Sequence, residues 1–152
     1  MLGTMRFVLI AVLLAGCSAP PPVEKPKPDV TAEAWYGETV EHLQAAARQA
    51  EDLYRKGRPD EAAGVIARAE PDLKRVLEAP HPTLGAMEAA SSLDSLYGRM
   101  LMGNQHYGWA RLTFQKNAAR WRYWSPRTPE SERRLREANE AIAECDRLLA
   151  GH

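Results

Sequence analysis

One cysteine stands where the composition of the chain changes abruptly. Cys17 follows an unbroken run of eight apolar residues, Phe7 to Leu14, and precedes a segment with five prolines between Ser18 and Asp29. Cysteine is intrinsically a strong nucleophile once its thiol ionises. The apolar run is far shorter than the roughly 20 residues that a membrane-spanning helix needs. With Arg6 before it, the run instead predicts the apolar segment of an export signal that ends beside this thiol.

No other constellation in the sequence predicts catalysis. The 152 residues contain no nucleophile elbow, phosphate-binding loop or paired-histidine zinc motif. The four histidines lie far apart, and two cysteines are too few for an all-cysteine site of four ligands. Cys145 could be a reactive thiol, but it falls on the apolar face of a predicted helix, which favours a core position. We therefore expect a protein that is not an enzyme and that holds no metal and no other cofactor.

The residues around Cys17 resemble the lipobox of bacterial lipoproteins, and Leu14, Ala15, Gly16 and Cys17 each match the family pattern. The resemblance implies that a signal peptide, 1–16, is removed. It also implies that Cys17 carries a diacylglycerol through a thioether and a further acyl chain on its new amino group. Two or three acyl chains hold a protein stably on a membrane, whereas one chain does not. The alternative is an ordinary signal peptide with a chance cysteine.

Residues 17–29 are expected to form a lipidated cysteine and a proline-rich tether ahead of a helical domain, 30–152. A proline-rich segment rises about 3.1 Å per residue, so Ser18 to Asp29 would span roughly 35–40 Å. Ser18 beside the cysteine is similar to the outer-membrane class of lipoproteins, whereas aspartate there is typical of retention in the inner membrane. The resemblance thus implies an anchor in the bacterial cell envelope facing the periplasm, with the outer membrane favoured.

Basic and aromatic residues gather in the last third of the sequence. Between Arg111 and Arg136 there are eight basic residues and two glutamates, a net charge of +6, whereas residues 31–78 have seven basic and ten acidic residues, a net charge of −3. Arginine and tryptophan together are typical of binding hot spots. The candidate binding patch consists of Arg120, Arg122, Trp124 and Arg127. The alternative is a solvated basic face in which some arginines pair with Glu137 or Glu140.

The elements that must position these residues are helices. Apolar residues recur every three or four positions after Asp29, and prolines, glycines and threonines interrupt the pattern. Pro71 should kink or split the second helix, because its ring clashes with the preceding turn. Short connections favour antiparallel neighbours, so we expect an all-α fold of five amphipathic helices, as a bundle or a short solenoid. The expected helices cover about 31–56, 59–78, 84–103, 105–123 and 129–149, with Thr31, Thr83 and Thr128 as N-terminal caps.

Two stretches resemble tetratricopeptide repeats, whose paired helices touch through small residues. In the first, Gly57 ends the leading helix, and the family spacing is nearly met by residues 53, 54, 62, 66 and 69. The second, around Tyr107 and Phe114, matches more loosely. Ala62 and Ala110 are 48 positions apart, whereas the family period is about 34 residues. The resemblance implies helical hairpins and leaves open whether they are true repeats.

The predicted location in the cell envelope and the predicted helical fold together indicate a non-catalytic scaffold or accessory subunit that binds another envelope protein. Helical hairpins present a groove that takes a helix or an extended peptide. The layout resembles that of secretin pilotins and of accessory subunits of outer-membrane assembly machines. The alternative function is binding of an anionic envelope polymer or lipid, such as peptidoglycan or lipopolysaccharide, through the basic and aromatic residues at 111–136. Nucleic acid is not an expected partner of an exported lipoprotein.

Overall fold

The computed structural model describes residues 28–151, which form five α-helices joined by short connections, with no strand in that range. The predicted all-α fold is therefore confirmed. The predicted signal peptide and lipobox, including Leu14, Ala15, Gly16 and Cys17, lie outside the described residues. The helices are α1 (Ala34–Arg55), α2 (Pro59–Leu77), α3 (Leu84–Gly103), α4 (Tyr107–Arg122) and α5 (Pro129–Ala150).

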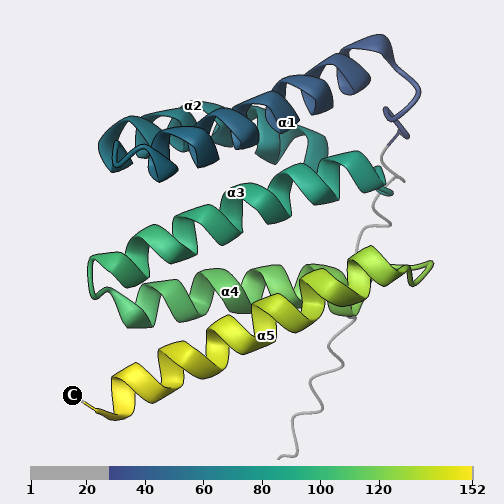
Figure 1. Ribbon diagram of the computed structural model, residues 1–152. Helices are drawn as coiled ribbons and strands as arrows, with labels where there is room; N and C mark the ends of the chain where they lie inside the picture. The colour runs from purple at the N-terminus through teal and green to yellow at the C-terminus, as the bar shows by residue number, and fades with distance from the viewer. Residues whose placement is uncertain (1–27, 152) are drawn as a thin grey trace, which may run out of the picture.

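The helices lie side by side and alternate in direction (Figure 1). α3 is central, because it packs against α1 and α2 on one side and against α4 on the other. α5 packs mainly on α4 and has little contact with α3. The start of α1, the α2–α3 connection and the α4–α5 connection all lie at one end of the molecule, and the α1–α2 and α3–α4 turns lie at the other (Figure 1).

Residues with defined roles at helix ends set these bounds. Gly57 follows α1 with φ at +71°, a region that glycine enters without steric cost. The Thr83 hydroxyl accepts a hydrogen bond from the Ala86 amide at 3.3 Å. Thr128 and Ser131 form a capping box at the start of α5, since each side chain accepts from the other residue's amide. The predicted starts of α3 and α5 are confirmed.

The predicted start of α1 is wrong. Thr31 does not cap the helix, because its amide and hydroxyl both donate to the Asp29 carboxylate, at 3.0 and 2.7 Å, in a turn that precedes α1. The predicted split at Pro71 does not occur either, since α2 continues across it. Pro71 and Ala67 are both exposed, so water can bond the Ala67 carbonyl that the proline ring leaves without a helical partner.

A buried tyrosine ties the first three helices together. The Tyr36 hydroxyl donates to the Val76 carbonyl oxygen at 3.1 Å and accepts from the Thr83 amide at 3.2 Å. Val76 lies near the end of α2, and Thr83 caps α3. The Tyr36 side chain therefore holds both helices against α1. Trp121 and Cys145 are both fully buried, which confirms the core position predicted for Cys145.

Three large apolar residues of the helices are partly exposed. Leu84, Tyr97 and Leu149 are 40%, 44% and 45% exposed. Leu84 and Leu149 lie in the first turn of α3 and the last turn of α5. Tyr97 lies at the edge of a hollow between α2, α3 and α4, which leaves one side of its ring in solvent.

α3 and α4 approach each other closely at Gly98. A Cβ atom there would lie 2.6 Å from two ring carbons of Phe114, and that ring is buried, so it would have to shift. We expect Gly98→Ala to lower the free energy of unfolding by about 1–3 kcal/mol through over-packing.

Gly37→Ala is the matched control, because a Cβ at Gly37 meets nothing within 4 Å. Alanine there should raise the free energy of unfolding by about 0.5–1 kcal/mol through helix propensity. Urea unfolding of both variants measures the difference. If Gly98→Ala proved as stable as Gly37→Ala, the close helix contact would be disproved.

Candidate functional site

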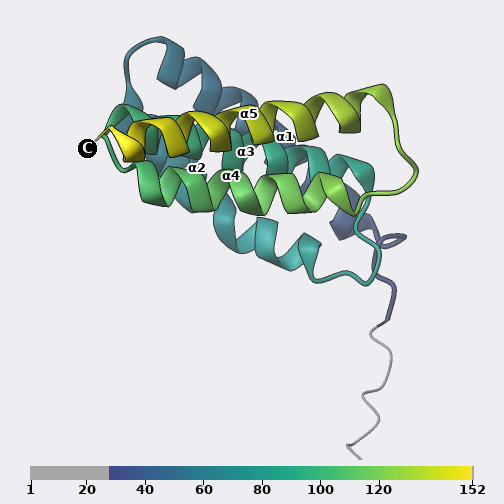
Figure 2. The same cartoon turned by 90° about the horizontal axis from the view of Figure 1, so that it is seen from below.

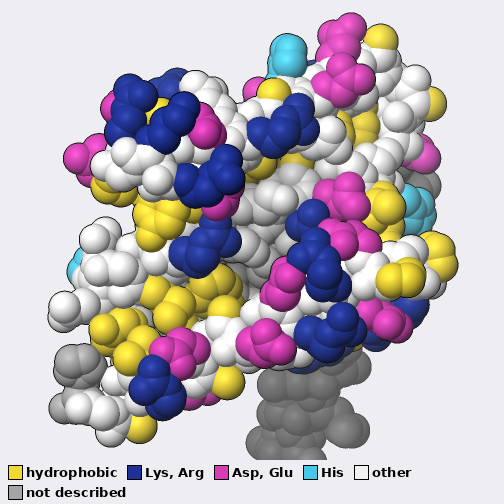
Figure 3. Space-filling view, in the orientation of Figure 1, with side chains coloured by type: hydrophobic (Ala, Val, Ile, Leu, Met, Phe, Trp, Pro, Cys, Tyr) yellow, Lys and Arg dark blue, Asp and Glu magenta, His cyan; other side chains and the backbone are white. Residues whose placement is uncertain are grey.

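The face of the molecule shown in Figure 3 is hollowed along α3, between α1 and α5. One hollow of about 750 Å³ lies between α1, α3 and the start of α5. A second of about 520 Å³ lies between α3, α4 and α5. The two hollows follow one another on a single face of α3, which carries Glu88, Ser92, Ser95, Arg99 and Met102. The two hollows and the face of α3 that they share are here named the α3 groove.

The groove exists because α5 docks on α4 and not on α3. Cys145 of α5 is buried and packs with Ala110 and Phe114 of α4, whereas α5 and α3 have little contact. The space between α3 and α5 is therefore left open. Small residues make much of the floor, which lets another chain approach the helices closely. They are Ala47, Ala89, Ser92, Ser95, Ala138 and Ala141.

Charged side chains form the two rims of the groove (Figure 3). The α1 rim has Arg48, Glu51, Asp52 and Arg55, and the α5 rim has Arg134, Glu137, Glu140 and Glu144. Within residues 28–151, neither Arg48 nor Glu140 has an ion pair. These two side chains stand on opposite rims and are available to a bound partner.

Two polar contacts cross the groove floor and brace it. Arg99 of α3 forms an ion pair with Glu51 of α1. Arg134 of α5 reaches back to α3, where its NH1 donates to the Ser92 hydroxyl at 3.3 Å. The α1 and α5 rims are thus each connected to the helix between them, so the groove is preorganised for a partner.

The predicted binding residue Arg120 is not on a free surface. Its guanidinium lies 2.9 Å from the Asp94 carboxylate of α3 as an ion pair, and its side chain is only 7% exposed. Its NH1 also donates to the Asn117 side-chain oxygen at 3.1 Å. The exposed Lys116 contacts the other Asp94 oxygen at 2.9 Å. Arg120 is therefore a structural residue between α3 and α4, and its prediction as a binding residue is wrong.

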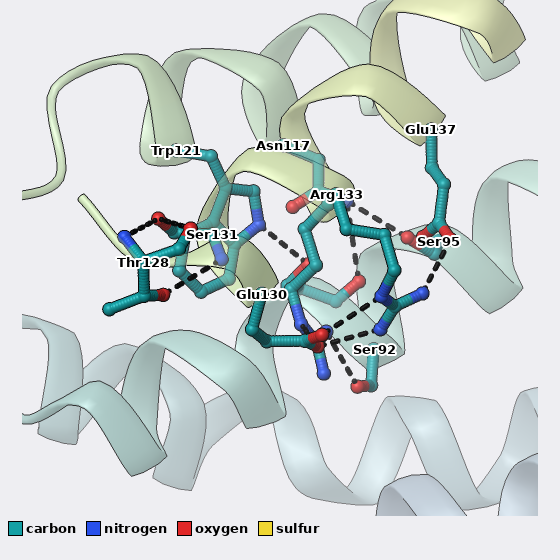
Figure 4. Close-up of polar contacts among 11 residues, drawn as sticks. Ser92, Ser95, Asn117, Trp121, Thr128, Glu130, Ser131, Arg133 and Glu137 are labelled. Carbon is teal, nitrogen blue, oxygen red and sulfur yellow. Dashed lines mark hydrogen bonds and ion pairs between the residues drawn. The ribbon is translucent and has the colours of Figure 1, made fainter.

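Two further arginines of the basic cluster are held by carboxylates at the start of α5 (Figure 4). Arg133 contacts Glu130 at 2.6 Å and Glu137 at 2.5 Å, and Arg134 contacts Glu130 at 2.6 Å. The hydrogen bonds from Arg133, and then those from Arg134, lower the pKa of Glu130 to about 2. The predicted pairing of an arginine with Glu137 is confirmed.

The remaining patch residues lie together in the connection 122–127, here named the α4–α5 loop. Arg122 and Arg127 are exposed and have no ion pair among the described residues. The Arg127 guanidinium donates to the Arg122 carbonyl oxygen at 3.1 Å, which closes the loop. Trp124 is half-buried, and its ring meets the buried Trp121 edge-on at 6.3 Å between centroids. Tyr123, absent from the predicted patch, is 81% exposed.

The other candidate chemistry is buried or dispersed. Burial raises the pKa of the Cys145 thiol, which keeps it protonated in the core. Over residues 28–151, no group of three or more histidine, cysteine, aspartate or glutamate side chains is placed to hold a metal ion. Among the helices described, none is both long enough and apolar enough to cross a membrane.

The groove residues were not predicted from the sequence. A signal is present, since Ala89, Ser92 and Ser95 repeat every three residues beside the apolar stripe of α3. Small residues at that spacing indicate a face that a neighbour approaches closely, but they do not say whether that neighbour belongs to the same chain. Comparison with known proteins gives no match to a family model, a curated protein or a solved structure.

Proposed function

We propose that this chain is a lipid-anchored, non-catalytic helical lipoprotein of the bacterial cell envelope. Its domain acts as a protein-interaction scaffold or accessory subunit that binds a segment of another envelope protein in the α3 groove. The anchor is the acylated Cys17 that the lipobox resemblance implies, on the periplasmic side and with the outer membrane favoured. The α3 groove is the observation that carries the proposal of protein binding.

The dimensions of the groove suit a peptide segment. From Glu88 to Met102 its floor follows 15 residues of α3, which corresponds to about 22 Å at 1.5 Å per residue. That length accepts a partner helix of about 15 residues, or about seven residues of extended chain at 3.3 Å each. A floor of small side chains admits either form.

The charges on the rims suit a segment with residues of both signs. Arg48 on one rim and Glu140 on the other lack ion pairs among the described residues. A bound segment with an acidic residue beside Arg48 and a basic residue beside Glu140 would pair with both side chains. The reversed segment would place like charges side by side. The rims thus favour one orientation of the bound segment.

The lining residues give no support for catalysis. The two hollows contain neither histidine nor cysteine, and most of their charged side chains line the rims of the groove. Two of them, Glu137 and Glu144, are paired with Arg133 and Arg147. Such groups bind and orient a partner, which is consistent with the proposed non-catalytic role.

Site-specific crosslinking in cells tests the groove. A photoreactive amino acid at Ser92, in the groove floor, should capture one envelope protein at a defined segment. The same amino acid at Lys74, exposed on α2 away from the groove, is the matched control and should not capture it. Capture of the same protein at equal yield from both positions, or of none from Ser92, would contradict the proposal.

A steric block gives the quantitative prediction. Ser92→Trp fills the floor, whereas Lys74→Trp places the same side chain at an exposed position outside the groove. We expect Ser92→Trp to weaken binding of the captured segment at least about tenfold, equal to 1.4 kcal/mol or more. Lys74→Trp should leave the affinity unchanged. Fluorescence anisotropy with the labelled segment measures both, and thermal unfolding shows whether each variant is folded.

The alternative, an anionic polymer bound by the whole basic cluster, has less support. Five of the eight basic residues between 111 and 136 are in ion pairs with carboxylates of this chain. They are Arg111, Lys116, Arg120, Arg133 and Arg134. Their charge is already compensated, so the cluster attracts an anion much less than its net charge of +6 indicates.

A further inference from the structure

We propose that the α4–α5 loop rests on the headgroup layer of the membrane that holds Cys17, and so sets the orientation of the domain above that membrane. The inference rests on the lipid anchor of the proposed function. It adds a second contact with the bilayer, made by the folded domain itself. The bound chemistry is an anionic phospholipid surface, and the contact residues are Arg122, Tyr123, Trp124 and Arg127.

The first observation is where the chain enters the domain. The described chain begins at Pro28, at the same end of the molecule as the α4–α5 loop, and Figures 1 and 2 show this from two directions. The α3–α4 turn, at residues 104–106, lies at the opposite end. An anchor attached before Pro28 therefore pulls the loop end of the domain toward the membrane, and not the far end.

The second observation is the length of chain that separates the anchor from the domain. Eleven residue steps lead from Cys17 to Pro28, so the two are at most about 40 Å apart even in a fully extended chain. The domain has a similar dimension, since α5 with 22 residues is about 33 Å long at 1.5 Å per residue. The end of the domain at Pro28 thus stays within about 40 Å of the anchor, which is slightly more than the length of α5.

The third observation is the chemistry of the loop. Tyr123 is 81% exposed, and Trp124 leaves part of its ring in solvent while its other edge meets Trp121. Tyrosine and tryptophan are the residues enriched at membrane–water interfaces. Arg122 and Arg127 are exposed beside them and can pair with lipid phosphates, a contact worth about 1 kcal/mol for each cation near an anionic surface.

The loop is also preorganised for this contact. Arg127 donates to the Arg122 carbonyl oxygen at 3.1 Å, and the capping box of Thr128 and Ser131 fixes the start of α5 directly after the loop. Both aromatic residues are thus presented on a closed turn between two helix ends. A rigid turn loses little conformational freedom when it meets a surface.

The charges indicate which side of this end faces the lipid. Residues 122–134 contain four arginines and two glutamates, a net charge of +2. On the other side of the same end, residues 28–35 and 75–82 contain Asp29, Glu33 and Glu78 against Arg75, a net charge of −2. An anionic surface therefore attracts the α4–α5 side and repels the α1–α2 side, so the domain should tilt with the loop downward.

Polarity-sensitive dyes on two engineered cysteines test the inference in the full lipidated chain. The variants are Tyr123→Cys in the loop and Asn104→Cys in the exposed turn at the opposite end. Cys145 is fully buried, so it does not compete for the dye. The protein is placed in vesicles of phosphatidylcholine with and without phosphatidylglycerol. We expect a blue shift and a gain in emission only at position 123, larger with phosphatidylglycerol and reduced by added salt.

A charge variant measures the contribution of one arginine. Arg122→Gln should reduce the equilibrium constant for loop contact about fivefold, which corresponds to the roughly 1 kcal/mol of one cation near an anionic surface. Arg68→Gln, exposed on α2 away from the loop, is the matched control and should leave the contact unchanged. Equal effects of the two substitutions would overturn the proposed contact.

The outcomes separate this inference from the proposed function. If the chain floats with the vesicles but the dyes at 123 and 104 respond alike, the membrane contact is overturned and the anchor stands. If position 123 responds only when peptidoglycan fragments or lipopolysaccharide are added, the loop binds a polymer and the membrane contact is likewise overturned. If the chain does not float at all, the anchor itself fails, and with it both proposals.

Discussion

Asp94→Asn should lower the free energy of unfolding by about 3 kcal/mol, because it leaves the buried charge of Arg120 without its counter-charge. The Arg120 side chain is 7% exposed, and its guanidinium lies 2.9 Å from the Asp94 carboxylate. Removing one partner of a buried ion pair generally costs about 3–5 kcal/mol, and the lower end applies here because the amide oxygen can still accept the hydrogen bond that Lys116 donates to Asp94. Urea unfolding followed by circular dichroism measures the change.

Two further variants make the prediction about Asp94 specific. Glu61→Gln breaks an exposed pair with Arg58 and should cost less than about 1 kcal/mol. The double variant Asp94→Leu with Arg120→Met removes both charges and should recover most of the lost stability, since a buried pair is often replaced by apolar residues at little cost. If Asp94→Asn cost no more than Glu61→Gln, Arg120 would be solvated and its assignment as a structural residue would be wrong.

Trp121→Ala should have a similarly large effect, because this side chain fills the junction of α3, α4 and α5. Trp121 is fully buried, and its indole nitrogen donates to the Ser91 hydroxyl of α3 at 2.8 Å. The Arg134 guanidinium of α5 lies 5.6 Å from its ring centre. Truncating a buried tryptophan to alanine costs about 3–5 kcal/mol, and the Ser91 hydroxyl also loses its donor.

Trp109→Ala is the control for Trp121→Ala. Trp109 lies on the same helix but is 68% exposed, so its removal should change the free energy of unfolding by less than about 0.5 kcal/mol. Thermal unfolding of both variants distinguishes the two positions. Equal losses at the two sites would contradict the buried position of Trp121 and, with it, the support that Trp121 gives to the α4–α5 loop.

The helices could be predicted from the sequence because their signals are local. Pro59 and Pro129 begin α2 and α5, Gly57 follows α1, and Thr128 caps α5. The cap predicted at Thr31 failed because a competing partner, Asp29, lies only two residues away and takes both of its donors. Local propensity does not decide between two short-range hydrogen bonds of similar strength.

The placement of the charged residues could be predicted only in part. The pair of Arg133 with Glu137 follows from their spacing on one helix. The pair of Arg120 with Asp94 joins two helices, and nothing local indicates it. Asp94 offers the only hint, as an acidic residue within a largely apolar helix.

The α3 groove could not be predicted because it depends on which helix α5 covers. The apolar stripe of α5, including Ala138 and Cys145, predicts burial but not the partner helix. In the structure, α5 covers α4 and leaves the face of α3 with Ser92 and Ser95 open. Which neighbouring helix α5 packs against depends on side chains from distant parts of the sequence. A periodic apolar pattern alone therefore does not predict it.

The groove and the loop divide two roles between different parts of the domain. The groove runs along the length of α3 and is proposed to hold a protein segment. The loop lies at the end where the chain enters and is proposed to meet the bilayer (Figure 1). A domain held at one end on the membrane would keep the groove open to partners in the periplasm, which is the arrangement that an anchored scaffold requires.

Mass spectrometry of the N-terminal peptide from the native membrane fraction tests the proposed lipid anchor. We expect a peptide that begins at Cys17 and carries a diacylglycerol on sulfur and an acyl chain on its amino group. A mature chain that begins elsewhere, or an unmodified Cys17 in protein recovered from the soluble fraction, would contradict it.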